Sequence, residues 1–205
     1  MILKIYPENP NPKYIDKIVE VLRKGGIIIY PTDTIYGIGC DIHNHKAVEN
    51  IARLKGIKAE KAQFSIICYD LSQISDYTRP ISNWVFKLMK RNLPGPFTFI
   101  LEANNKVPAI FQSNKKTVGI RIPDNKIILE IVREFGSPIL TTSVHDIDEI
   151  VEYTTDPELI HETYKDKVDL VVDGGFGNNI ASTVVDCTGE EPVIIRQGIE
   201  ELIFS

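Results

Sequence analysis

Cysteine is scarce in this sequence, and its spacing excludes two common kinds of site. Cys40, Cys68 and Cys187 are the only cysteines in 205 residues, and no Cys-x-x-Cys motif occurs. An odd number of widely separated cysteines indicates neither a disulfide framework nor a zinc cluster. We therefore expect three small, buried thiols in a protein of the reducing cytoplasm.

Long apolar runs are also missing. The N-terminus has no basic segment followed by an apolar stretch, so we expect no secretory signal. The apolar run at residues 27–30 is far too short to cross a bilayer. These two absences predict a cytoplasmic protein with no membrane association.

Positive charge is not in excess. The chain has 23 Lys and Arg residues against 28 Asp and Glu residues, which gives a formal net charge of −5 at pH 7. This balance excludes a protein that coats nucleic acid with its whole surface, but it permits a local basic pocket. A hydrophobic content of 43% is typical of a globular chain that can bury a core without disulfides or metals.

Short apolar segments alternate with amphipathic helices over the first two thirds of the chain, and short strands dominate the rest. Strands are expected at residues 2–6, 27–30, 64–68, 97–101, 117–122, 139–142, 168–172, 182–186 and 193–196. Helices are expected over about 15–22, from a cap at Asn44, from a cap at Ser82 and from a cap at Asn125. The pattern favours an α/β fold on a twisted, mixed parallel and antiparallel sheet, with residues 1–205 as a single domain.

Residues 30–39 place hydroxyls, a carboxylate and two glycines between a buried strand and a helix. Loops that leave the carboxyl end of a strand commonly bind ligands in α/β sheets. The Thr and Tyr hydroxyls of this segment could orient polar groups of such a ligand. The alternative is an ordinary turn that binds no ligand and is made of residues that favour turns. A P-loop motif is absent.

Four cations lie close together at the end of the second predicted helix: Arg53, Lys55, Lys58 and Lys61. Cations at a helix C-terminus suit the helix dipole, so a solvated helix end is one interpretation. The other is a phosphate clamp, because flexible ammonium groups could bind a triphosphate. Both interpretations stay open from spacing alone.

Arg121 alternates with apolar residues inside a predicted strand. An arginine on a core strand is costly to bury unpaired, so it should have a partner. That partner could be an internal carboxylate or the carboxylate of a ligand. The sequence does not choose between them.

Further polar groups gather near strand ends in the second half of the chain. They are three hydroxyl residues at 141–143, a glycine-rich turn at 173–177, a Ser- and Thr-bearing strand at 181–186, and a second strand arginine, Arg196. No Ser-His-Asp relay or pair of catalytic carboxylates emerges from their spacing. Such a set suits binding of an anionic nucleotide and a carboxylate, with reactivity supplied by the substrates and often by Mg²⁺.

In this order, the segments resemble the YrdC-like domain family, the threonylcarbamoyl-AMP synthases. The matching pieces are KGGIIIYPTDTIYGIG (24–39), the cationic segment at 53–61, LPGPFTFIL (93–101), TVGIRIP (117–123), SPILTTS (137–143), VDGGFG (172–177), STVVD (182–186) and PVIIRQG (192–198). The resemblance implies a twisted α/β sheet with a large basic central cavity. It also implies ATP, L-threonine and bicarbonate as substrates, with Mg²⁺, and threonylcarbamoyl-adenylate and pyrophosphate as products.

The resemblance assigns roles to ten residues. By position in the family motifs, the substrate-binding residues are Thr34, Tyr36, Arg121, Thr141 and Ser182. The nucleotide-binding residues are Lys55, Lys58, Thr117, Ser143 and Arg196. The implied partners are a downstream complex that transfers the threonylcarbamoyl group to tRNA, and tRNA or double-stranded RNA itself.

Two family motifs are altered in this chain. The KxR motif is here Lys55-Gly56-Ile57, without its arginine, and the SxN motif is Ser143-Val144-His145, without its asparagine. These changes make the chain similar to the YciO-like branch of the family. We therefore expect a threonylcarbamoyl-AMP synthase. The alternatives are an RNA-binding protein or a nucleotide-dependent enzyme that acts on a different small substrate.

Overall fold

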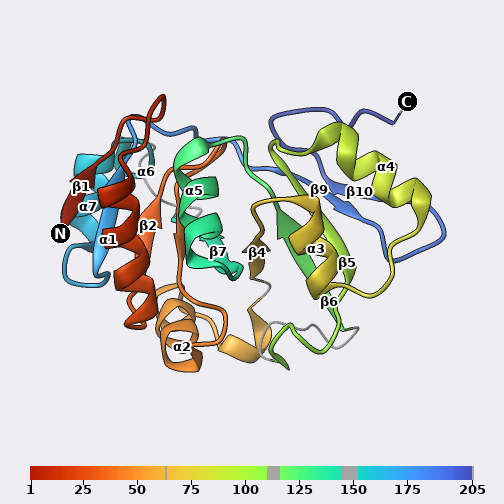
Figure 1. The fold of residues 1–205 in the computed structure, drawn as a ribbon, viewed down its shortest axis with the longest axis horizontal. Coiled ribbons are helices and arrows are strands. Elements are labelled where there is room, and N and C mark those ends of the chain that lie inside the picture. Colours follow the sequence, from red (N-terminus) through yellow and green to blue (C-terminus); the bar gives the residue numbers. More distant parts are fainter. Residues whose placement is uncertain (63, 110–115, 145–151, 205) are drawn as a thin grey trace.

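A mixed sheet of ten strands runs through the whole molecule (Figure 1). The computed structural model describes residues 1–62, 64–109, 116–144 and 152–204. The strands are β1 (Ile2–Lys4), β2 (Ile28–Tyr30), β3 (Gly37–Gly39), β4 (Ser65–Ile67), β5 (Phe97–Glu102), β6 (Thr117–Arg121), β7 (Ile139–Ser143), β8 (Leu170–Asp173), β9 (Thr183–Asp186) and β10 (Val193–Arg196). Their order in the sheet is β1-β8-β2-β3-β7-β4-β6-β5-β9-β10.

Parallel and antiparallel pairs are interspersed along the sheet. β8 pairs in parallel with both β1 and β2, and β4–β6 and β5–β9 are also parallel. The remaining pairs are antiparallel, including β3–β7 and β4–β7 in the middle of the sheet. The α/β fold with a mixed sheet, which was predicted from the sequence, is confirmed.

Helices cover the sheet, and most begin at a side chain that caps them. They are α1 (Pro12–Arg23), α2 (His45–Leu54), the 3₁₀ helix η1 (Ala59–Lys61), α3 (Leu71–Tyr77), α4 (Asn83–Asn92), α5 (Lys126–Phe135), α6 (Glu152–Thr155) and α7 (Pro157–Tyr164). The predicted caps Asn44, Ser82 and Asn125 accept hydrogen bonds from the first turns of α2, α4 and α5. In the ranges that the structure describes, no helix combines the length and apolar character needed to cross a membrane.

Two apolar clusters hold the helices on the sheet. α1 and α5 pack against each other, and their buried residues form one cluster with Ile28, Tyr30 and Leu170 of the sheet. The larger cluster includes residues of α2, α4 and the central strands. Figure 1 shows α1 and α5 over one half of the molecule, and α3 and α4 over the other half.

The sequence-based assignment missed a strand within residues 30–39. Gly37–Gly39 forms β3, which pairs antiparallel with β2, so the connecting loop covers only residues 31–36. Two glycines in a three-residue strand do not give the apolar pattern that marks other strands. α3 and α7 were not assigned as separate helices either. The polar stretch at 147–167 lies partly outside the described residues, and its remainder contains α6 and α7.

The glycines of β3 leave room for the side chain of Tyr30. That ring is fully buried, and its hydroxyl donates to the carbonyl oxygen of Leu140 at 3.2 Å. A Cβ atom on Gly37 would lie 2.6 Å from the Tyr30 ring. A Cβ atom on Gly39 would collide with the Leu140 carbonyl oxygen. Glycine is therefore required here by packing within the sheet.

We expect Gly39→Ala to destabilise the fold by about 1–3 kcal/mol, because backbone atoms must move to accept the methyl group. Urea unfolding followed by circular dichroism measures this change. Gly189→Ala is the matched control, because a Cβ there meets only the Glu191 carbonyl oxygen, at 3.7 Å. Equal stabilities for the two variants would contradict the packing role of Gly39.

Candidate functional site

A cavity of about 160 Å³ opens at the middle of the sheet, where β3, β7, β4, β6 and β5 lie side by side. Six of the ten predicted site residues line it: Thr34, Arg121, Thr141, Ser143, Ser182 and Arg196. Gly37, Ser65 and Thr98 also contribute to its wall. Segments that are far apart in the sequence therefore meet at one polar cavity.

Sheet register explains why these groups converge. Ser65 of β4 is paired with Gly119 of β6 on one side and with Thr141 of β7 on the other. Directly paired residues point to the same face of a sheet. Gly119 has no side chain, and a Cβ there would come within 2.5 Å of the Ser65 hydroxyl. The missing side chain at Gly119 therefore leaves room on β6 for the Ser65 hydroxyl of β4.

Arg121, the last residue of β6, is anchored by the loop that follows β2. Its Nη2 donates to Asp33 Oδ1 at 2.8 Å and to the Thr34 hydroxyl at 2.9 Å. The second carboxylate oxygen of Asp33 accepts from the backbone N–H of Asp124 at 2.8 Å. The partner that the sequence left undecided is thus an internal carboxylate. Asp33 was not singled out by sequence reasoning, although it sits in the segment 30–39.

The ion pair is buried on both sides. The side chains of Arg121 and Asp33 retain only 10% and 9% of their exposure. Burial raises the pKa of Asp33 and lowers the pKa of Arg121, while their mutual attraction opposes both shifts. Each charge is therefore tolerated because the other is present.

The Arg121 guanidinium is not fully used by these contacts. Within the described ranges, Nη1 makes no hydrogen bond, and Nε is buried without a partner. Unpartnered donors on a buried cation are costly, and an anionic ligand in the cavity would relieve part of that cost. The arrangement is suited to a carboxylate.

A second arginine reaches the cavity from the edge of the sheet. A register shift between Ile194 and Arg196 interrupts the pairing of β10 with β9, and such bulges redirect side chains. Arg196 Nη2 donates to the Ser182 carbonyl oxygen at 2.9 Å and to its hydroxyl at 3.2 Å. That hydroxyl also lies 2.8 Å from the Thr98 hydroxyl. Ser182 and Arg196 therefore form one hydrogen-bonded group at the cavity wall.

Tyr36 is not among the residues that line the cavity, and its role as a ligand contact stays a prediction. It is fully buried, and its hydroxyl donates to the Gly175 carbonyl oxygen at 2.6 Å and accepts from the Gly174 N–H at 3.1 Å. The hydroxyl is thus occupied by the glycine-rich turn after β8. The structure makes Tyr36 a residue that positions this turn.

The remaining predicted residues lie beside the cavity or away from it. Lys55 Nζ donates to the Ser143 carbonyl oxygen at 3.0 Å, so this lysine holds the end of β7. Lys58 precedes η1 and is exposed. Thr117 begins β6, at the opposite end of that strand from Arg121. His145, which replaces the asparagine of the SxN motif, lies outside the described residues.

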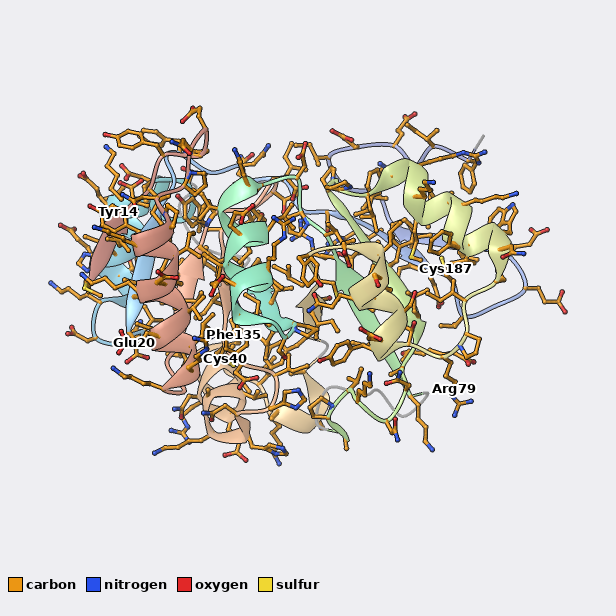
Figure 2. The ribbon with its side chains drawn as sticks, viewed as in Figure 1. Tyr14, Glu20, Cys40, Arg79, Phe135 and Cys187 are labelled. Carbon is orange, nitrogen blue, oxygen red and sulfur yellow. The ribbon has the colours of Figure 1, made fainter. Side chains whose placement is uncertain are left out.

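The cysteines offer no activated thiol. Cys40 and Cys187 lie in different halves of the molecule (Figure 2). Burial raises the pKa of Cys187 to about 12, and it raises the pKa values of Cys40 and Cys68 as well. A thiol with a raised pKa stays protonated and is a poor nucleophile.

We therefore expect iodoacetamide at pH 8 to label the folded protein at least about 100-fold more slowly than the protein in urea. The thiolate fraction at that pH falls from roughly a quarter for an ordinary cysteine to about 10⁻⁴ for a pKa of 12. Mass spectrometry of the labelled cysteines measures the rates. Fast labelling of one cysteine in the folded protein would contradict the assignment of inert thiols.

The sequence and the fold of this chain are both similar to those of known proteins. A model of the Sua5/YciO/YrdC family, described as telomere recombination, matches residues 20–198. The uncharacterized protein YciO of Escherichia coli is 38% identical over 200 residues, 97% of this chain and 95% of YciO. Its crystal structure superposes with a TM-score of 0.90 over 98% of this chain and 97% of that one.

More distant relatives carry a functional name. A threonylcarbamoyl-AMP synthase of Bacillus subtilis is 32% identical over 190 residues, which are 92% of this chain and 54% of the synthase. The structure of P. abyssi Sua5 complexed with L-threonine has a TM-score of 0.87 at 28% identity, over 97% of this chain and 57% of Sua5. The resemblance seen in the sequence, including its nearness to YciO, is confirmed. A large basic cavity remains a prediction.

Proposed function

The chain belongs to the Sua5/YciO/YrdC family, and from that premise we propose that it forms threonylcarbamoyl-adenylate from L-threonine, bicarbonate and ATP. The observation that carries the proposal is the partly unsatisfied Arg121 guanidinium at a polar cavity lined by Thr34, Thr141 and Ser182. The complex of P. abyssi Sua5 with L-threonine supports the choice of amino acid.

The size of the cavity favours an amino acid over a nucleotide. Pockets that enclose drug-sized ligands measure about 300–1,000 Å³, whereas this cavity measures about 160 Å³. We assign the amino-acid carboxylate to Arg121, since a cation with spare donors forms strong charge-assisted hydrogen bonds with it. Thr34, Thr141 and Ser182 would orient the rest of the amino acid.

ATP would lie at the mouth of the cavity. Arg196 and Ser143 line its wall, and Lys55 is anchored at the end of β7 beside Ser143. We assign the phosphates to these residues and to Lys58, while Thr117 remains a predicted nucleotide contact. No group of three or more metal-ligating side chains gathers in the ranges that the structure describes. Mg²⁺ would therefore arrive with the ATP phosphates, whose negative charge it neutralises.

The reaction needs positioning more than a protein nucleophile. The threonine amine and bicarbonate form a carbamate and release water. A carbamate oxygen then attacks the α-phosphorus of ATP, the bond to the β-phosphate breaks, and pyrophosphate leaves. Holding these reactants together supplies much of the rate enhancement for such a transfer. Hydroxyls and arginines can provide that positioning.

The product would serve tRNA modification. A downstream complex would take the threonylcarbamoyl group from the adenylate to tRNA, in the cytoplasm. Direct binding of tRNA or double-stranded RNA receives less support. The formal net charge of −5 gives the protein no overall attraction for an RNA backbone.

A second candidate is a nucleotide-dependent enzyme for a different small carboxylate. Lys55-Gly56-Ile57 lacks the arginine of the family motif, and Lys55 is bonded to the Ser143 carbonyl oxygen. Both features change the groups available to phosphate or substrate. The similarity to YciO, which is itself uncharacterized, is the reason to test this candidate beside the first.

Pyrophosphate release tests the proposal. The purified protein with Mg²⁺ and ATP should release pyrophosphate only when L-threonine and bicarbonate are both present. Omission of either substrate is the control, and a panel of other amino acids tests the second candidate. If L-threonine gives no more release than the controls and another amino acid does, the second candidate replaces the first.

A further inference from the structure

A second cavity of about 440 Å³ lies beside the Arg121 cavity, against the loops that follow β2 and β8. These two strands are parallel neighbours, so their carboxyl ends meet at the same edge of the sheet. Thr32 and Asp33 line the cavity from one loop, and Phe176 and Asn179 line it from the other. Ligands in α/β proteins bind preferentially outside the carboxyl ends of parallel strands.

The loop after β8 is firmly held. Asp173 Oδ1 accepts from the Gly175 N–H at 2.9 Å, and Gly175 has a φ of 92°, which favours glycine. The Gly177 N–H donates to the Thr155 carbonyl oxygen at 2.8 Å. The Asn178 N–H donates to the Thr34 carbonyl oxygen at 3.2 Å. Together with Tyr36, these bonds fix the loop from several directions.

This fixed loop nevertheless holds a phenyl ring in water. Phe176 is 81% exposed, which is the highest value among the large hydrophobic side chains of the described ranges. Anchoring an aromatic ring in solvent does not stabilise the fold, because no apolar area is buried. A ring carried on a backbone that is already held lowers the cost of binding a flat ligand against it.

The polar groups of the cavity complement an uncharged ligand. Its lining contains hydroxyls, the Asp33 carboxylate, whose charge is paired with Arg121, and the carboxamides of Asn178 and Asn179, but no Lys, Arg or His among the described residues. The Asn179 carboxamide makes no hydrogen bond to the described part of the chain, so its donor and acceptor are both available. A phosphate would find no cation here, whereas the edge of a heterocyclic base would find both a donor and an acceptor.

We propose that this second cavity is a nucleobase-binding site, in which a base stacks on Phe176 and the Asn179 carboxamide contacts its edge. The base could belong to a free nucleoside or to a single-stranded RNA, since both present the same ring. The site is distinct from the Arg121 cavity and from the position assigned to ATP.

The two cavities share a wall, so their ligands should influence each other. Asp33 lines the second cavity while its carboxylate holds Arg121 of the first. The Thr32 and Thr34 hydroxyls, one from each cavity, lie 3.1 Å apart. A base that shifts Asp33 or Thr32 would alter the Arg121 cavity, and the coupling would act equally in both directions.

The test is a backbone-amide NMR titration of the full chain with adenosine, ribose, inorganic phosphate and a single-stranded heptaadenylate. Adenosine or the oligonucleotide should shift the amides of residues 175–179. Phe176→Ala should weaken that binding by about 5- to 150-fold, the loss expected for one stacked base. Phe204→Ala, which removes another exposed phenyl ring (49%), should leave it unchanged. Binding of adenosine identifies a free nucleoside, and binding of the oligonucleotide alone identifies RNA.

Three results would overturn the proposal. The first is the absence of binding by both adenosine and the oligonucleotide. The second is binding that survives Phe176→Ala but is lost in Arg196→Ala, which would place the base at the Arg121 cavity. The third is ribose binding as tight as adenosine binding, which would indicate a sugar site. Because the titration contains neither L-threonine nor ATP, its result is independent of the proposed synthase activity.

Discussion

Replacing Arg121 by alanine is expected to weaken L-threonine binding by about 10- to 150-fold. A charge-assisted hydrogen bond to a ligand carboxylate contributes roughly 1.5–3 kcal/mol, and each 1.4 kcal/mol is a factor of ten in affinity. Arg121 is the described cation that is buried at the cavity and has donors to spare. Isothermal titration calorimetry with L-threonine measures the change.

Two controls separate binding from folding. Asp33→Asn combined with Arg121→Ala avoids leaving a buried carboxylate unpaired, and it should lose threonine binding as the single variant does. Arg79→Ala removes a surface arginine whose side chain is 58% exposed and points away from the ribbon (Figure 2). It should bind threonine normally. Unchanged affinity in Arg121→Ala would show that Arg121 is structural.

Replacing Asp33 by alanine is expected to destabilise the protein by about 3–5 kcal/mol. The change leaves the buried Arg121 cation without its partner, and breaking a buried ion pair costs about this much. It also removes the acceptor for the Asp124 N–H, which joins the loop after β2 to the segment before α5. Urea denaturation followed by circular dichroism measures the difference in unfolding free energy.

The double variant Asp33→Leu with Arg121→Met separates the net contribution of the ion pair to stability from the cost of leaving one buried charge unpaired. Replacing both charges with apolar groups of similar size removes the desolvation penalty, so stability should recover to near that of the original protein. Threonine binding should still be lost. If Asp33→Ala alone is as stable as Arg79→Ala, the ion pair does not contribute as described.

Much of the fold was predictable because its signals are local. Asn44, Ser82 and Asn125 each precede an amphipathic stripe, and each caps the helix expected there. Gly136 adopts a left-handed conformation at the end of α5, as a glycine in that position predicts. Helix starts and ends depend on a few adjacent residues, so one sequence is enough to find them.

The contents of the site were harder to predict because they depend on contacts over long separations. The need for a partner of Arg121 followed from the cost of burying charge, but the choice of Asp33 is set by how β6 meets the loop after β2. Tyr36 was expected to contact a ligand, yet the turn after β8 takes its hydroxyl. β3 was not predicted because its glycines are required for packing against the Tyr30 ring, which faces them from the neighbouring strand.

The most direct test of the central claim is a crystal structure of the protein with L-threonine. We expect the ligand to lie in the cavity at the middle of the sheet, with its carboxylate hydrogen-bonded to the Arg121 guanidinium and its remaining atoms near Thr34, Thr141 and Ser182. Asp33 should keep its ion pair with Arg121. Threonine bound elsewhere, or a carboxylate that makes no contact with Arg121, would show that Arg121 does not bind the substrate carboxylate.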